Sequence, residues 1–289
     1  MSGTIGGVAA AIVDIAFLVV LAAVAAREIV AGKNWRNLRV LIVLGVLIAG
    51  NVVFHAEVIG ANSADYGKRI GIAAVILMIS LIGGRVVPSF TNNWLTRHNP
   101  GRLPVAFACF DVVALALSAL ALSAWVALPA NAASGILLMS AGLLQAIRLA
   151  RWAGDRAVAD RLVLVLHVGY AFVPLGFLLT GASTFLSEVP VSAGIHAWTA
   201  GAVGLMTLAV MTRATLGHTG QKLEAGILTQ AIYGLVLLAA VLRIVAAFTG
   251  ATMLLQIAGL AWVAGFAGFV LVYGPLLAMR RPAWKDAHN

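Results

Sequence analysis

The sequence predicts an all-α protein, a polytopic transmembrane helix bundle with about nine spans, and three observations support this prediction. Hydrophobic residues make up 62% of the 289 residues and charged residues only 10%, whereas an average soluble domain carries roughly 25% charged residues. The mean hydropathy is +1.02. Apolar runs of about twenty residues, which suffice to cross a hydrocarbon core, recur along the chain. Only short loops separate them, so we expect residues 1–289 to form a single integral membrane domain.

The limits of the spans follow from the apolar runs and from the residues that interrupt them. The first run follows MSGTIGG, which lacks the basic region of a signal peptide, and we therefore interpret it as a true span. Pro100 and Pro104 flank the third loop, and Pro190 directly precedes the seventh span. The expected spans are residues 6–28, 37–61, 68–90, 103–126, 132–153, 160–181, 191–213, 224–247 and 252–279.

The net charge of +9 predicts an orientation in the membrane and no nucleic-acid partner. Lys and Arg gather in the odd-numbered loops and the C-terminal tail, and loops four, six and eight contain none. The fifth loop is assigned Arg148, Arg151, Arg156 and Arg161. Because cytoplasmic loops carry the excess of basic residues, we expect a cytoplasmic C-terminus and, after nine spans, a periplasmic N-terminus. The single cysteine, Cys109, excludes an internal disulfide.

Ionisable residues inside the expected spans are candidate functional groups, because burying them in hydrocarbon is costly. At a rise of 1.5 Å per residue, His55 lies roughly 9–10 Å, and His196 about 8 Å, below the outer surface. Two histidines at one depth on different helices can ligate one haem iron or copper. We therefore predict a shared metal for His55 and His196. His167, roughly 9 Å from the opposite surface, would need a second metal. A hydrogen bond across helices is the alternative for each imidazole.

Other polar residues in the spans have two interpretations each. Tyr170 lies three residues after His167, on the same helix face, and either donates to a group that His167 binds or packs in the core. Arg85 and Arg213, near the cytoplasmic ends, either extend to the headgroups or anchor an anionic group such as a haem propionate. Asp14 and Asp111 could accept from a ligating imidazole or pair with Arg243, and the sequence does not choose.

Four stretches together resemble the NnrS family of bacterial inner-membrane proteins. They are GNVVFHAE, GGRVVPSFTNNW, LHVGYAFVPLGFLLTG and HAWTAGAVGLMTLAVMTRATLGHTG. The resemblance implies haem b and copper as cofactors and a link with nitric oxide and denitrification. It implies His55, His196 and His167 as metal ligands, and Arg85, Arg213, Tyr170 and His218 as cofactor-binding residues. Without the resemblance, a loop residue such as His218 would be given only a solvated surface role.

The resemblance covers the last three quarters of the family pattern, which has about twelve spans and an early W-H-A-H-E type segment. That segment is absent here, and we expect that the first three family helices are missing. The missing segment would reach the same depth as His55 and His196 and would complete their metal site. Three more helices would also move the N-terminus to the cytoplasm, the easier arrangement for a chain without a signal peptide.

The resulting hypothesis is an NnrS-like protein that binds haem and copper. It would act in nitric oxide metabolism or in the response to nitrosative stress. Its expected partners are the lipid bilayer and nitric oxide or an iron-nitrosyl species. Whether it is an enzyme stays open. One alternative is a small-solute or ion transporter or channel, with Asp14, Asp111 and Arg243 along its path. The other is a haem-copper type oxidoreductase, which the small number of histidines makes the weaker one.

Overall fold

The computed structural model of the chain describes residues 6–278. Within this range the protein is helical without strands, and nine helices are long and apolar enough to cross a membrane. Both results confirm the predicted fold class. The elements are α2 (Gly7–Ala31), η1 (Trp35–Asn37), α3 (Leu38–Ala61), α4 (Asp65–His98), α5 (Cys109–Ala127), α6 (Ala132–Ala150), η2 (Gly154–Arg156), α7 (Arg161–Ala182), α8 (Val191–His196), the π-helix η3 (Ala197–Val203), α9 (Gly204–His218), α10 (Ile227–Thr249) and α11 (Thr252–Ala278).

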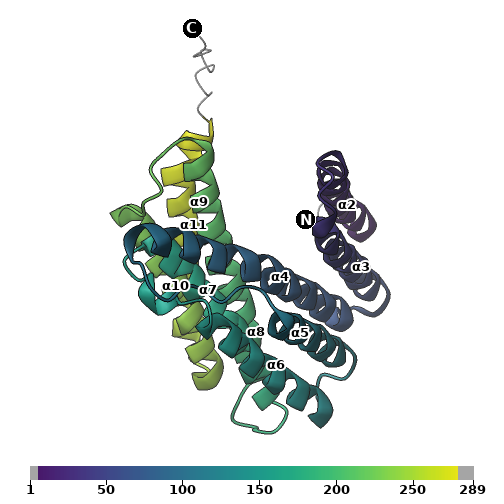
Figure 1. Cartoon of the computed structure of the whole chain (residues 1–289). Helices are drawn as coiled ribbons and strands as arrows, with labels where there is room; N and C mark the ends of the chain where they lie inside the picture. Colours follow the sequence, from purple (N-terminus) through teal and green to yellow (C-terminus); the bar gives the residue numbers. More distant parts are fainter. Residues whose placement is uncertain (1–5, 279–289) are drawn as a thin grey trace.

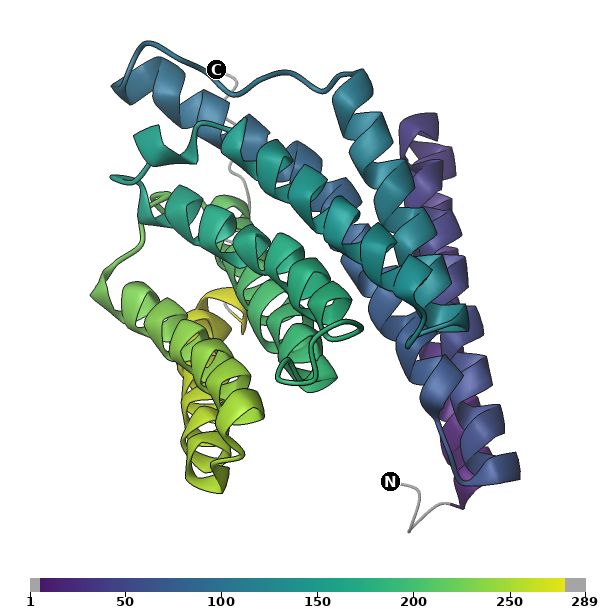
Figure 2. The same ribbon diagram turned by 90° about the horizontal axis from the view of Figure 1, so that it is seen from below.

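Helix α7 is the centre of the bundle, and the hairpin of α2 and α3 is its edge (Figure 1). α7 packs on α4, α6, α8, η3 and α9, whereas α2 packs on α3 and α3 in turn on α4. In α7, 67% of the most apolar stretch is buried inside the protein, and in α2 only 6% is. α10 and α11 form a second hairpin, which lies on the opposite side of the bundle from α2 and α3 (Figure 2).

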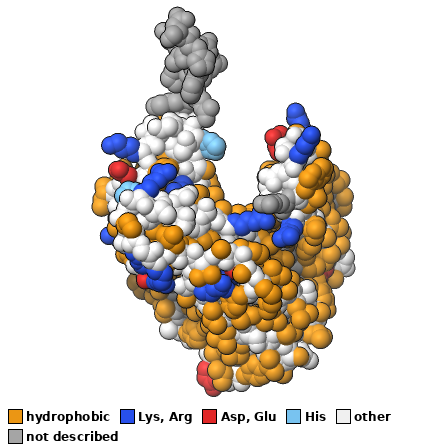
Figure 3. All heavy atoms as spheres, in the orientation of Figure 1, with side chains coloured by type: hydrophobic (Ala, Val, Ile, Leu, Met, Phe, Trp, Pro, Cys, Tyr) orange, Lys and Arg blue, Asp and Glu red, His pale blue; other side chains and the backbone are white. Residues whose placement is uncertain are grey.

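The surface of the bundle has the pattern that a bilayer requires. Apolar side chains cover much of the face seen in Figure 3, and Lys and Arg side chains gather toward one end of it. That end is the one at which α4 ends and α5 begins (Figure 1). Water satisfies charged groups only outside a hydrocarbon core, so an apolar zone bounded by basic side chains is typical of a membrane-spanning bundle.

Two span boundaries differ from the prediction for a local reason. The third span continues through Pro88 to His98, and the Thr91 hydroxyl donates to the Val87 carbonyl at 2.8 Å within the turns around the proline. The fourth helix begins at Cys109 and not at residue 103, because residues 102–108 are not helical. In that segment the Val105 amide donates to the Arg151 carbonyl at 3.0 Å, so the chain follows the end of α6 before it turns into α5.

The basic residues also correct the prediction. Arg213 does not end the seventh span, because α9 continues to His218, which is therefore helical and not part of a loop. Arg148 lies inside α6, and Arg161 is the first residue of α7. The assignment of Arg148 to a loop failed because it relied on charge alone, whereas a buried carboxylate supplies this arginine with a partner inside the protein.

Close packing of α3 on α4 depends on Gly67. A Cβ atom at this position would lie 2.3 Å from the backbone Cα and N atoms of Phe54, which cannot move aside as a side chain would. We expect Gly67→Ala to lower the free energy of unfolding by about 1–3 kcal/mol, because it separates the two helices. Gly71→Ala, one turn further along α4, is the control, since nothing lies within 4 Å of its Cβ position. Thermal unfolding in detergent measures both, and equal midpoints would contradict the packing argument.

Candidate functional site

The structure does not bring His55 and His196 together. His55 Nε2 lies 3.0 Å from Asp14 Oδ2, and the Asn51 amide donates to the same oxygen at 2.9 Å. These residues belong to the α2–α3 hairpin, whereas His196 ends α8, which packs on α7 and α10. α3 packs on α4, and α4 in turn packs on α7 and η3. Helical rise fixes only the depth of a residue, so the matched depths did not reveal this lateral separation.

His167 makes the contact across helices that was the alternative to metal ligation. Its Nε2 lies 2.8 Å from the Thr91 hydroxyl on α4, and only 9% of the residue is exposed. Its Nδ1 is also tightly packed, because a Cβ atom added to Gly154 would lie 2.4 Å from it. Both ring nitrogens are therefore enclosed by protein. His98 is on the surface, where it stacks on Trp94 and contacts the Trp94 carbonyl.

A cluster of buried polar side chains surrounds Arg148, between α4, α5, α6 and α7. The fully buried guanidinium donates from Nε to Asp111 Oδ1 at 2.9 Å and from Nη1 to the Ser80 carbonyl at 2.9 Å. Nη1 also lies 3.2 Å from the Tyr170 hydroxyl, which donates to Gln145 at 2.8 Å. Tyr170 therefore belongs to this cluster, and Asp111 pairs with Arg148 rather than with Arg243.

Sequence reasoning missed the role of Arg148, although a signal was available. Gln145, Arg148 and Trp152 are spaced by three and four residues, which places them on one face at the end of α6. The arginine contacts the Trp152 ring, with 5.4 Å between Cζ and the ring centroid. Gly84 makes room for it, because a Cβ there would lie 2.1 Å from Nη2. This Nη2 is buried without a hydrogen-bond partner among the described residues.

The two arginines that were predicted to hold anionic groups lie in separate places. Arg85 lines a cavity of about 370 Å³ together with Gly84, Asp111 and Trp152, and its Nη1 donates to Asn37 at 3.2 Å. Arg213 lies instead over the Phe90 ring, with its Cζ 3.9 Å from the ring centroid. One Arg213 nitrogen is buried without a hydrogen-bond partner in the described part of the chain.

His196 occupies a different setting, directly before the π-helix η3. π-helical turns are rare and occur frequently at functional sites. Trp198 holds this one in place, because its fully buried indole donates from Nε1 to the Val173 carbonyl of α7 at 3.1 Å. Gly176 admits the indole, since a Cβ there would lie 2.2 Å from the ring. The helix is thus pinned on its inner side, opposite to the α10–α11 hairpin.

A cavity of about 390 Å³ opens between η3, α10 and α11. Its lining includes Thr199, Ala200, Arg243 and Trp262. His196 is not itself a lining residue; it precedes Thr199 and Ala200 by three and four residues, where the α-helix changes into the π-helix. Arg243 is close enough to act electrostatically on His196, and no carboxylate lies within 4.0 Å of Arg243 among the described residues. An imidazole and an unneutralised guanidinium can together bind a metal-containing or anionic ligand.

Other potential ligands are dispersed. Within residues 6–278 no group of three or more His, Cys, Asp or Glu side chains is arranged to hold a metal ion. The family model described as NnrS protein matches residues 1–281 of the chain. Comparisons with curated proteins and with solved structures give no match.

Proposed function

Because the chain belongs to the NnrS family, we propose that it acts in the bacterial response to nitric oxide and binds haem b in the inner membrane beside His196. The observation that carries the site is the common cavity of the π-helix and Arg243, with His196 one turn before its lining residues. Its volume of about 390 Å³ is smaller than a haem, so a bound haem would project from the opening of the cavity.

The residues around this cavity include one that would ligate a haem iron and one that would anchor an anionic group. A neutral imidazole is a common haem ligand, and His196 would supply it. Arg243 is an intramembrane cation without a carboxylate partner among the described residues, which suits it to a propionate. Trp262 contributes a flat apolar wall. When bound, a haem supplies an iron atom that coordinates nitric oxide.

Copper does not fit the described part of the chain in the same way. His55 and Asp14 form a two-residue contact at 3.0 Å, and the third side chain, Asn51, is an amide. Copper sites of the usual kind need further imidazole or sulfur ligands. We therefore assign no step to copper.

The alternative of a transporter or channel gains no support from the positions of its three proposed residues. Asp14 lies on the α2–α3 hairpin, and Asp111 is paired with Arg148 inside the bundle. Arg243 lies on α10 and lines the cavity between η3, α10 and α11. A common path through them would have to cross the packed core around α7. Binding of a haem that responds to nitric oxide is the function that this geometry favours.

Titration of the purified protein with haem tests the proposal. We expect the shifted Soret band of bound haem in the parent protein, the spectrum of free haem with His196→Ala, and an undiminished shifted band in His98→Ala, whose histidine is on the surface. Added imidazole should restore the band in His196→Gly, because it replaces the missing ligand in the space that the side chain leaves. An unchanged band in His196→Ala would refute the assignment.

A further inference from the structure

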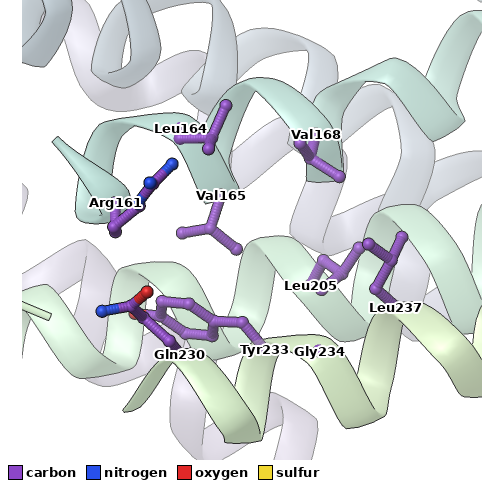
Figure 4. Close-up of a pocket in the computed structure, with 9 residues that line it drawn as sticks. All are labelled: Arg161, Leu164, Val165, Val168, Leu205, Gln230, Tyr233, Gly234 and Leu237. Carbon is purple, nitrogen blue, oxygen red and sulfur yellow. The ribbon is translucent and has the colours of Figure 1, made fainter. Parts of the chain in front are cut away.

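A second cavity, of about 210 Å³, lies between α7, α9 and α10. Figure 4 shows polar side chains at one end of it and apolar side chains along the rest. Arg161, Gln230 and Tyr233 form the polar end, and Leu164, Val168 and Leu237 are among the apolar residues. The polar end lies at the beginning of α7, the end of the bundle that carries the basic loops. The cavity is therefore amphipathic in the same direction as a lipid molecule.

The polar end has unused hydrogen-bonding and charge capacity. The Tyr233 residue is 7% exposed, and its hydroxyl lies beside the hydroxyl of Thr212 on α9. Nearby, one Arg213 nitrogen is buried without a hydrogen-bond partner among the described residues. A buried polar group without a partner costs about 1–3 kcal/mol, so an occupant that supplies acceptors would be stabilised here.

The charges around this end favour an anionic occupant. Arg161 donates from Nη1 to the Val158 carbonyl at 3.2 Å, and no described carboxylate lies within 4.0 Å of its guanidinium. Asp160 is the acidic neighbour, and its Oδ1 already accepts the Leu162 and Val163 amides at the start of α7. Arg161 and Arg213 against Asp160 leave one positive charge in excess.

We propose that this cavity binds an anionic phospholipid of the leaflet at the basic end of the bundle. The phosphate lies against Arg161, and the oxygens of the glycerol region accept from Tyr233 and Gln230. One acyl chain follows Leu164, Val168 and Leu237. Basic pockets between transmembrane helices on the cytoplasmic side recognise anionic headgroups in this way. A neutral isoprenoid quinone would also occupy the apolar part, but it would leave the excess positive charge unpaired.

Native mass spectrometry of the purified protein, with phosphatidylglycerol or phosphatidylcholine added at equal concentration, tests this inference. We expect phosphatidylglycerol to be retained more strongly. One interfacial arginine contributes about 1 kcal/mol, so Arg161→Gln should reduce this retention about fivefold. Tyr233→Phe should also reduce the retention of phosphatidylglycerol, because it removes the hydroxyl that donates to the glycerol region. Arg97→Gln is the matched control, because Arg97 is an exposed arginine at the same end of the bundle, in the last turn of α4.

Three outcomes would overturn the inference. The first is equal retention of the two lipids, and the second is an Arg97→Gln variant that loses as much phosphatidylglycerol as Arg161→Gln. The third is a bound quinone that phosphatidylglycerol does not displace. The lipid cavity lies on the far side of α7 from the Arg148 cluster. It does not include His196 and shares no lining residue with the cavity proposed for haem, so haem binding and lipid binding can fail independently. Thermal unfolding of each variant confirms that it folds, so that a loss of lipid is assigned to the cavity.

Discussion

Arg148→Met is expected to lower the free energy of unfolding by about 3–5 kcal/mol, the usual cost of removing one partner of a buried ion pair. Arg148 is fully buried and Asp111 is 4% exposed, so the substitution would leave a carboxylate inside the bundle. The remaining cation, Arg151, lies 3.8 Å from Asp111 and cannot replace the hydrogen bond at 2.9 Å. The Ser80 carbonyl and the Tyr170 hydroxyl would lose a donor as well.

A double variant separates the charge effect from the loss of packing. Asp111→Asn combined with Arg148→Met removes the stranded charge, so we expect it to be more stable than Arg148→Met alone. Arg97→Gln, on the exposed end of α4, should change stability by no more than about 0.5 kcal/mol. Chemical or thermal unfolding in detergent, followed by tryptophan fluorescence, measures all three. A loss for Arg148→Met no larger than that for Arg97→Gln would show that the cluster does not stabilise the bundle.

Arg243→Gln is expected to weaken haem binding about tenfold to a hundredfold, because a hydrogen bond to a charged group contributes about 1.5–3 kcal/mol. Arg243→Lys should recover part of the affinity, since it keeps the charge and loses the paired donors. Titrations followed by the Soret band give the dissociation constants. The dimethyl ester of haem is the control, because its propionates carry no charge. If Arg243→Gln weakens binding of the ester as much as that of haem, Arg243 does not act on a propionate.

Composition and run length predicted the fold well because a bilayer demands long apolar helices whatever their contacts. They failed where a local interaction decides the boundary. The helix through Pro88 continues to His98, with Thr91 bonded to a backbone carbonyl in its next turn, and α5 begins late because residues 102–108 follow the end of α6. Periodicity could not reveal the π-helix after His196 either, since it depends on the fit of Trp198 into the space at Gly176.

The candidate site was less accessible to sequence reasoning. Depth along a helix is a one-dimensional quantity, so it placed His55 and His196 at one level without showing that their helices, α3 and α8, pack on different neighbours. Asp14 contacts His55 and not Arg243, whereas the role considered for it beside an imidazole supposed that the imidazole ligates a metal. The partner of Asp111 was missed because Arg148 was counted among loop residues, although its spacing from Gln145 and Trp152 indicated a helix face.

The central claim is that His196 ligates a haem without His55, and the spin state of the ferric haem tests it most directly. A ferric haem held by one imidazole would be high-spin, so we predict that the protein, once free haem has been removed, gives a high-spin electron paramagnetic resonance signal that His55→Ala leaves unchanged and His196→Ala abolishes. A low-spin signal typical of two axial imidazoles, converted to high spin by His55→Ala, would contradict the account, because it would require the two histidines to meet.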